Sequence, residues 1–131
     1  MSDAINNEKT TYELIGGEKA IATLVERFYF YMDTLPEAKA VRAVHGESLA
    51  SAQVKLFKYL SGWLGGPDLF VQEYGHPRLR QRHFPFKVGV KEKDEWMMCM
   101  IKALNDIPME ANVRETLIQA FAPLAAHMVN Q

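Results

Sequence analysis

The chain has 131 residues, of which 48% are hydrophobic and 24% are charged. These values predict one globular domain over residues 1–131, with residues 1–9 as a flexible N-terminal extension, and argue against two full domains. The 15 Lys and Arg residues nearly balance the 16 Asp and Glu residues, so the net charge of −1 gives no general attraction for nucleic acid. A single cysteine, Cys99, excludes an internal disulfide and a cysteine zinc site.

The N-terminal sequence has neither the basic region nor the apolar run of a secretory signal. The longest stretch without a charged residue, 116–131, falls short of the roughly 20 apolar residues that span a bilayer. We therefore expect a cytoplasmic protein that binds neither membranes nor nucleic acid. Nothing in the sequence predicts its oligomeric state.

Apolar residues recur at helical spacing along the chain, which predicts an all-α fold. Thr10 and Glu13 resemble a capping box that begins a short helical turn. Pro36 can start another short helix, and Ser48 can cap the helix that follows. Gly65-Gly66-Pro67 is a strong helix stop. The long helices are expected over residues 18–33, 48–62, 91–107 and 111–129, the last of them kinked at Pro123.

No long helix fits between residues 68 and 77, and a short helix is expected over 78–84, between two prolines. Six of the 15 basic residues fall between Arg78 and Lys93. In the short helix, Leu79 and His83 share a face because they lie four residues apart, and arginines flank them. A neutral imidazole beside cationic side chains suits a metal whose carrier bears anionic groups, and haem has that arrangement.

Two other interpretations of this segment stay open on spacing alone. His83 can be a partly buried histidine on a solvated basic helix. The basic side chains can also neutralise phosphates while Phe84 or Phe86 stacks on a base, although no recognition-helix or zinc-finger motif is present. Taken singly, Tyr29 and Trp96 fit aromatic core residues, and His45 fits an exposed loop residue. No P-loop, GxGxxG or GxSxG motif is present.

Taken together, four parts of the sequence resemble the group II truncated haemoglobins, and the match extends from Tyr12 to Asn130. The segment HPRLRxRHxPF is the most specific of them. The matching parts are Phe28-Tyr29, Ser61 to Pro67, Gly75 to Phe86 and Trp96. The resemblance implies a two-over-two helical sandwich, a shortened globin fold, around haem b.

The resemblance also assigns site residues. His83 matches the proximal iron ligand, and Tyr29 and Trp96 match polar residues that face the ligand on the distal side. Lys55 and Arg82 match positions that reach the haem propionates. Ala52 matches the small residue where classical globins carry a distal histidine, with Leu56 one turn further on. The residues that match positions packed on the macrocycle are Phe28, Leu79, Phe86 and Val88.

His45 departs from the commonest family pattern, because this position usually holds tyrosine or phenylalanine and only sometimes histidine. Tyr29, His45 and Trp96 are then three hydrogen-bonding groups near a diatomic ligand. Such donors predict slow oxygen release, which argues against simple oxygen transport. The departure also leaves open whether His45 or Tyr29 occupies the sixth position on the iron. Because histidine titrates near neutral pH, His45 can couple ligand binding to pH.

The function implied by the resemblance is reversible binding of oxygen, nitric oxide and carbon monoxide. It extends to oxygen and nitric oxide chemistry, with nitric oxide dioxygenase or peroxidase-like turnover as candidate activities and an external reductase as the partner that turnover requires. Two alternatives compete with it. One is a haem-free helical module that holds an anionic partner with its basic segment, residues 78–93, and the other is a haem sensor or store.

Overall fold

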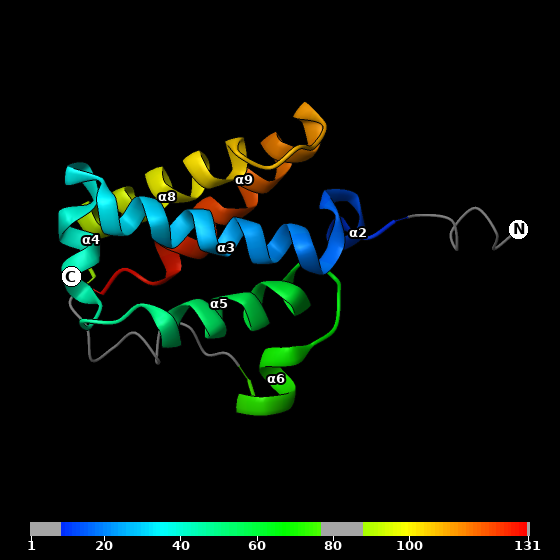
Figure 1. Cartoon of the computed structure of the whole chain (residues 1–131), viewed down its shortest axis with the longest axis horizontal. Helices are drawn as coiled ribbons and strands as arrows, with labels where there is room; N and C mark the ends of the chain where they lie inside the picture. The colour runs from blue at the N-terminus through cyan, green and yellow to red at the C-terminus, as the bar shows by residue number, and fades with distance from the viewer. Residues whose placement is uncertain (1–8, 77–87, 131) are drawn as a thin grey trace, which may run out of the picture.

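The computed structural model describes residues 9–76 and 88–130, and all regular structure within them is helical. The all-α prediction is therefore confirmed for this part of the chain. The expected extension over 1–9 lies outside the described residues except for Lys9. The elements are α2 (Thr11–Ile15), α3 (Gly17–Thr34), η1 (Pro36–Ala38), α4 (Lys39–Val44), α5 (Ala50–Trp63), α6 (Leu69–Tyr74), α8 (Val90–Asn105) and α9 (Ala111–His127) (Figure 1).

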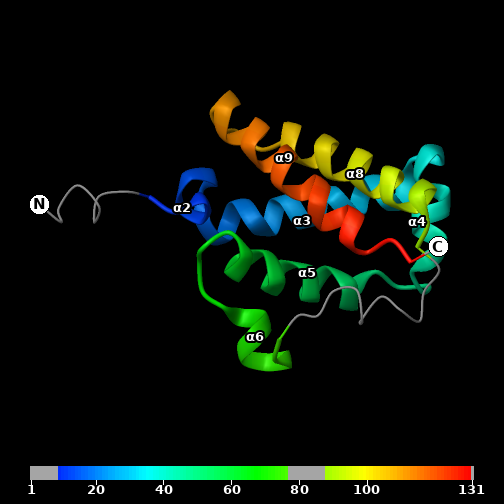
Figure 2. The same cartoon turned by 180° about the vertical axis from the view of Figure 1, so that it is seen from behind.

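Helix α3 is the centre of the fold. It packs against α8 and α5, while α9 packs against α8 and α6 packs against α5, and Figures 1 and 2 show α5 on the opposite side of α3 from the α8–α9 pair. The pairs α3–α5 and α8–α9 form the expected two-over-two arrangement. Fully buried apolar side chains fill the space where α3 meets α8 and α9, namely Ile21, Leu24, Phe28, Met32, Met100, Leu104 and Phe121.

The observed bounds follow the periodic pattern, with one correction at the start of α5. Ser48 is not the cap of this helix, because α5 begins at Ala50 and its N-cap is Leu49. The Ser48 hydroxyl accepts a hydrogen bond from the Ala50 amide at 3.2 Å, so it satisfies the first helical amide from one position further out. The expected capping box is confirmed, since Thr10 and Glu13 exchange hydrogen bonds at the start of α2.

The two glycines of the Gly65-Gly66-Pro67 stop after α5 are required for different physical reasons. Gly65 has a φ of +98°, a conformation that side chains with a Cβ rarely adopt. At Gly66 an added Cβ would lie 2.3 Å from the Tyr12 ring, so only glycine lets α2 approach this closely. The buried Ser61 hydroxyl donates to the Pro67 carbonyl at 2.6 Å. The turn therefore joins α2, α5 and α6, and α6 then ends at Gly75.

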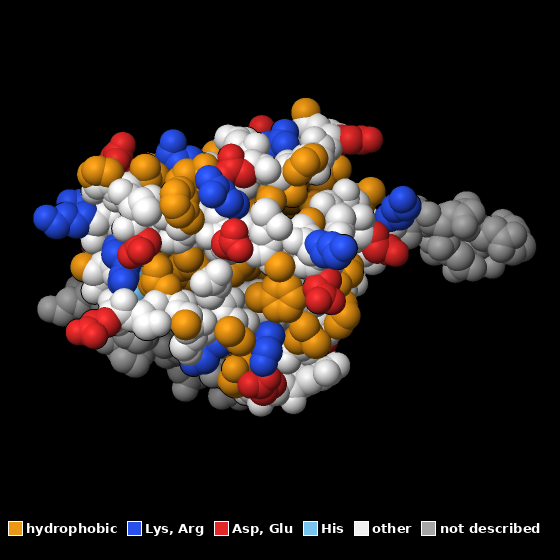
Figure 3. All heavy atoms as spheres, in the orientation of Figure 1, with side chains coloured by type: hydrophobic (Ala, Val, Ile, Leu, Met, Phe, Trp, Pro, Cys, Tyr) orange, Lys and Arg blue, Asp and Glu red, His pale blue; other side chains and the backbone are white. Residues whose placement is uncertain are grey.

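The surface shown in Figure 3 carries interspersed acidic and basic side chains, in keeping with the net charge of −1 (Figure 3). Within the described residues no helix is long and apolar enough to cross a membrane. The same residues contain no group of three His, Cys, Asp or Glu side chains that could hold a metal. Cys99 is fully buried in α8.

Candidate functional site

Tyr29 lies in the second half of α3 and is buried, with 7% of its surface exposed. Among the described residues, its hydroxyl donates one hydrogen bond, to the Ala52 carbonyl of α5 at 3.4 Å. This contact is long for an O–H···O bond, which is usually near 2.7–2.8 Å. Burial raises the pKa of the Tyr29 phenol above its ordinary range, so the group stays protonated at neutral pH and remains a donor.

His45 directly follows α4 and is half-buried, unlike the exposed loop residue that its corner position alone would predict. Its ring lies edge to face with the Tyr29 ring, with centroids 6.0 Å apart. The ring nitrogen Nδ1 lies 3.0 Å from the Val41 carbonyl. A carbonyl only accepts, so Nδ1 must carry a proton. The other ring nitrogen, Nε2, is then an acceptor when the ring is neutral and a donor when it is protonated.

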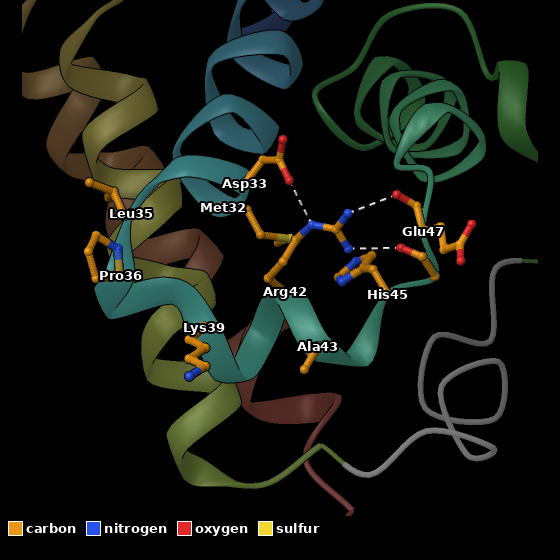
Figure 4. A pocket seen from close by; sticks show the side chains of 10 residues that line it. Met32, Asp33, Leu35, Pro36, Lys39, Arg42, Ala43, His45 and Glu47 are labelled. Atoms are coloured by element: carbon orange, nitrogen blue, oxygen red, sulfur yellow. Dashed lines mark hydrogen bonds and ion pairs between the residues drawn. The ribbon is translucent and has the colours of Figure 1, made fainter.

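Arg42 holds the corner that carries His45. Its guanidinium binds the Asp33 carboxylate at 2.9 Å and donates to the carbonyls of Gly46 at 2.8 Å and Glu47 at 2.9 Å. Figure 4 shows these bonds along a groove of about 680 Å³ between the end of α3 and the α4 corner (Figure 4). His45 lines the same groove, so it touches both the groove and the Tyr29 ring.

Trp96 lies on α8 and belongs to an aromatic cluster with α3 and α9. Its ring centroid is 5.1 Å from that of Phe28 and 6.0 Å from that of Phe121. Phe28 in turn contacts Tyr29 at 4.8 Å. The structure therefore brings Tyr29, His45 and Trp96 into one chain of neighbouring rings, with Phe28 between Tyr29 and Trp96.

Helix α5 lies next to Tyr29, whose hydroxyl bonds to the Ala52 carbonyl of this helix. Ala52 and Leu56 are half-buried and pack against the core, whereas Lys55 is exposed. The Lys55 ammonium lies 5.8 Å from the centre of the Tyr74 ring. The C-terminal end of α5 meets α9 through Trp63 and Phe121, at 4.7 Å between ring centroids. The apolar side chains nearer the N-terminal end of α5 are thus less enclosed by protein than those of α3.

Val88 is buried immediately before α8. Asn130 fixes it from the end of the chain, because its amide donates to the Val88 carbonyl at 2.8 Å and its side-chain oxygen accepts from the Val88 amide at 2.9 Å. The remaining predicted site residues, Leu79, Arg82, His83 and Phe86, lie outside the described residues. Their roles stay predictions.

Phe28 is fully buried in the core cluster, and Leu56 and Trp96 pack against that cluster, so these side chains form an apolar and aromatic wall. The buried Tyr29 phenol lies next to Phe28, and its hydrogen bond is long. A flat apolar macrocycle suits such walls, and a weakly bonded buried hydroxyl is available to a polar ligand.

Three residues of this region were missed by sequence reasoning. Phe121 has the helical spacing of a core residue, and nothing in that spacing indicates its contact with Trp96. Arg42 and Glu95 are charged residues on helices, and most of their partners are backbone groups. Arg42 binds the carbonyls of Gly46 and Glu47 beside the Asp33 carboxylate, and Glu95 binds the Val41 amide. Only the tertiary structure identifies such partners, because backbone groups leave no trace in the sequence.

Comparison with known proteins agrees with this geometry. The sequence model of the bacterial-like globin family matches residues 10–130. The group 2 truncated haemoglobin YjbI of Bacillus subtilis is 36% identical over 120 residues, which cover 92% of this chain and 88% of the relative.

Solved structures agree closely as well. A group II 2-on-2 haemoglobin from Agrobacterium tumefaciens superposes with a TM-score of 0.93 at 43% identity, covering 95% of this chain and 97% of the other. A cold-adapted truncated haemoglobin from Pseudoalteromonas haloplanktis gives 0.91 at 46% identity, covering 94% and 99%.

Proposed function

Because the chain belongs to the bacterial-like globin family as a group II truncated haemoglobin, we propose that Tyr29, His45 and Trp96 control its release of diatomic ligands. The family's cofactor is haem b, and gas binding at haem is its shared function. When bound, haem would supply an iron at which oxygen, nitric oxide or carbon monoxide can bind. The chain's own residues decide how long such a ligand stays.

The Tyr29 hydroxyl is the observation that carries this proposal. It is buried and protonated, and its 3.4 Å bond to the Ala52 carbonyl is weak enough to exchange for a better acceptor. The hydroxyl could therefore exchange this bond for one to a partly negative diatomic ligand, at little cost in its present hydrogen bonding.

Trp96 is the second donor, since an indole N–H can only donate. Each such bond to a partly charged ligand contributes on the order of 1 to 3 kcal/mol, or roughly 5- to 150-fold in dissociation rate. Two donors predict slow oxygen release, which favours oxygen chemistry over oxygen transport.

His45 adds a dependence on pH. With Nδ1 bound to the Val41 carbonyl, neutral His45 offers an acceptor at Nε2, and only the protonated ring offers a donor there. Among the described residues, the charged groups around this corner are Lys39, Arg42 and Glu47 on its own segment, Asp33 at the end of α3 and Glu95 on α8. Histidine ordinarily titrates near pH 6.5, so oxygen release is expected to be slower at pH 5 than at pH 8.

Rapid-mixing measurements of oxygen dissociation test these roles. Tyr29→Phe and Trp96→Phe remove a donor while keeping an aromatic ring, and each should raise the dissociation rate by roughly 5- to 150-fold. His45→Ala should abolish the difference between pH 5 and pH 8. Lys102→Ala, an exposed change on the same helix as Trp96, is the matched control. Unchanged rates in Tyr29→Phe and Trp96→Phe would refute the proposed control of release.

The cofactor side of the site rests on the family resemblance. His83 is proposed as the proximal ligand, with Lys55 and Arg82 near the propionates. His83→Ala should abolish the proximal-histidine absorption spectrum, and a variant that retains this spectrum would refute the assignment. The exposed position of Lys55 suits a group that meets a propionate at the protein surface.

Nitric oxide dioxygenase or peroxidase-like turnover is the proposed activity, in a cytoplasmic setting and with an external reductase as partner. Conversion of nitric oxide to nitrate under oxygen, measured with and without an added reductant, tests the first activity. Sustained turnover that requires the reductant is the expected result, and release of oxygen without nitrate formation would contradict it. No observation favours the haem-free alternative. In the described part of its basic segment, Lys93 pairs with Asp94 at 2.8 Å.

A further inference from the structure

The corner after α4 is held from two sides by charged side chains. On the solvent side, the Arg42 guanidinium reaches back to Asp33 at the end of α3 and forward to the carbonyls of Gly46 and Glu47. The backbone carbonyl of Arg42 accepts a hydrogen bond from the His45 amide at 3.0 Å. The backbone on each side of His45 is therefore bonded to one residue, Arg42 (Figure 4).

On the inner side, Glu95 of α8 caps α4. One carboxylate oxygen accepts from the Val41 amide at 2.9 Å. Val41 is the third residue of α4, and the α4 N-cap, Ala38, makes no side-chain cap bond. An acceptor at this position satisfies one of the amides left open at a helix start, and a negative charge there interacts favourably with the helix dipole. Glu95 supplies both from a different helix.

Arg42 and Glu95 both support the segment that carries the His45 ring. The Val41 amide is bound by Glu95, and the Val41 carbonyl accepts from His45 Nδ1 at 3.0 Å. Glu95 also directly precedes Trp96, so the same turn of α8 carries a distal donor and the support for His45. Displacement of Val41 would change the hydrogen bond that fixes the protonated ring nitrogen.

We propose that Arg42 and Glu95 are positioning residues that hold the His45 ring with Nδ1 on the Val41 carbonyl. This inference rests on the function proposed for His45 in ligand release. Arg42 and Glu95 do not touch the ligand. Their effect on ligand release acts only through His45.

A double-mutant cycle tests whether the effect passes through His45. Arg42→Met removes three hydrogen bonds and keeps most of the aliphatic bulk, and Glu95→Leu removes the cap at similar volume. In the wild-type background both should shift the oxygen dissociation rate in the direction of His45→Ala. In the His45→Ala background the same changes should alter the rate by less than about 2-fold, since coupled residues lose their effect when the partner is absent.

Conservative and matched controls sharpen the test. Glu95→Gln keeps an acceptor oxygen for the Val41 amide and should stay close to wild type. Arg27→Met removes another arginine that binds an acidic partner, Asp106 at 2.9 Å, away from the corner, and should leave the dissociation rate unchanged. If Arg42→Met does not fold, the comparison of Glu95→Leu with Glu95→Gln tests the same effect on His45.

Nitrogen-15 NMR of the His45 ring in the carbon monoxide complex gives a readout independent of release rates. The wild type should show the tautomer protonated at Nδ1, and Arg42→Met and Glu95→Leu should show loss of that signature. Unchanged ring signals in both variants would overturn the inference, as would rate changes that persist in full in the His45→Ala background. If His45→Ala alone leaves release unchanged, the role proposed for His45 fails, and the ring signals still decide the positioning.

Discussion

The interior between α3, α8 and α9 and the corner after α4 are held together in different ways. In the interior, fully buried apolar side chains such as Phe28 and Phe121 are in contact, and few polar bonds are involved. At the corner, Arg42 and Glu95 bind backbone groups, and Arg42, His45 and Glu95 are only half-buried. Apolar burial is the larger source of stability and has no direction, whereas hydrogen bonds contribute less but fix orientation.

The difference separates stability from function in this chain. Tyr29 and Trp96 lie on helices that the apolar interior fixes, whereas His45 lies on the segment that polar bonds fix. Changes in the interior should mainly lower the free energy of unfolding. Changes at the corner should mainly move His45.

Phe121→Ala should have the largest effect on stability. The Phe121 side chain is fully buried and contacts both Trp63 and Trp96, so its removal leaves a cavity at the junction of three helices. The free energy of unfolding should fall by about 3 to 5 kcal/mol, as measured by urea denaturation. A loss below about 1 kcal/mol would mean that the interior is not the main source of stability.

Ser61→Ala should have an intermediate effect, because it breaks a polar bond inside the apolar region. Ser61 is 1% exposed and donates to the Pro67 carbonyl at 2.6 Å. The change leaves a carbonyl without this donor in a buried turn, which costs about 1 to 3 kcal/mol. Urea denaturation beside Ser51→Ala, an exposed position on the same helix, should show the larger loss in Ser61→Ala. Equal losses would contradict the role of this bond.

Asp106→Asn should have a smaller, pH-dependent effect at the surface. The Tyr31 hydroxyl, and then Arg27, lower the pKa of the Asp106 carboxyl below its ordinary 3.8. Its contribution to stability is thus complete above about pH 4 and is lost as the pH falls through the lower folded-state pKa. Denaturation at pH 5 and pH 2 should show a larger loss for the wild type than for Asp106→Asn. Parallel curves would contradict the pairing.

Cys99 should show no reactivity in the native protein. It is fully buried, and burial raises the pKa of its thiol to about 11, so almost none of the reactive thiolate exists at pH 8. A thiol reagent should label the protein only after denaturation. Rapid labelling of the native chain would show that the α8 interior opens more readily than its packing implies.

The main helices could be predicted from the sequence because apolar periodicity and stop signals are local properties. The long helix expected over 18–33 is observed as Gly17–Thr34, and that expected over 91–107 as Val90–Asn105. The predicted start of α5 was wrong, because a serine side chain such as that of Ser48 can bond to a helical amide from outside the helix as well as from the cap position.

The candidate site was less predictable, because its hydrogen bonds join distant parts of the chain. The resemblance identified Tyr29, and the structure adds that its hydroxyl bonds to the Ala52 carbonyl. Likewise it identified His45, but the proton on Nδ1 follows only from the position of the Val41 carbonyl. Arg42 and Glu95 could not be found from the sequence, since the fold brings their partners to them, and these are backbone groups and the Asp33 carboxylate.

The visible absorption spectrum of the purified protein, ferric, reduced with dithionite and then exposed to carbon monoxide, is the most direct test that this chain holds a ligand-accessible haem. The account predicts a strong Soret band that shifts when carbon monoxide is added. A featureless spectrum that persists after haem is supplied would contradict it, and a Soret band that does not respond to carbon monoxide would contradict an accessible distal site.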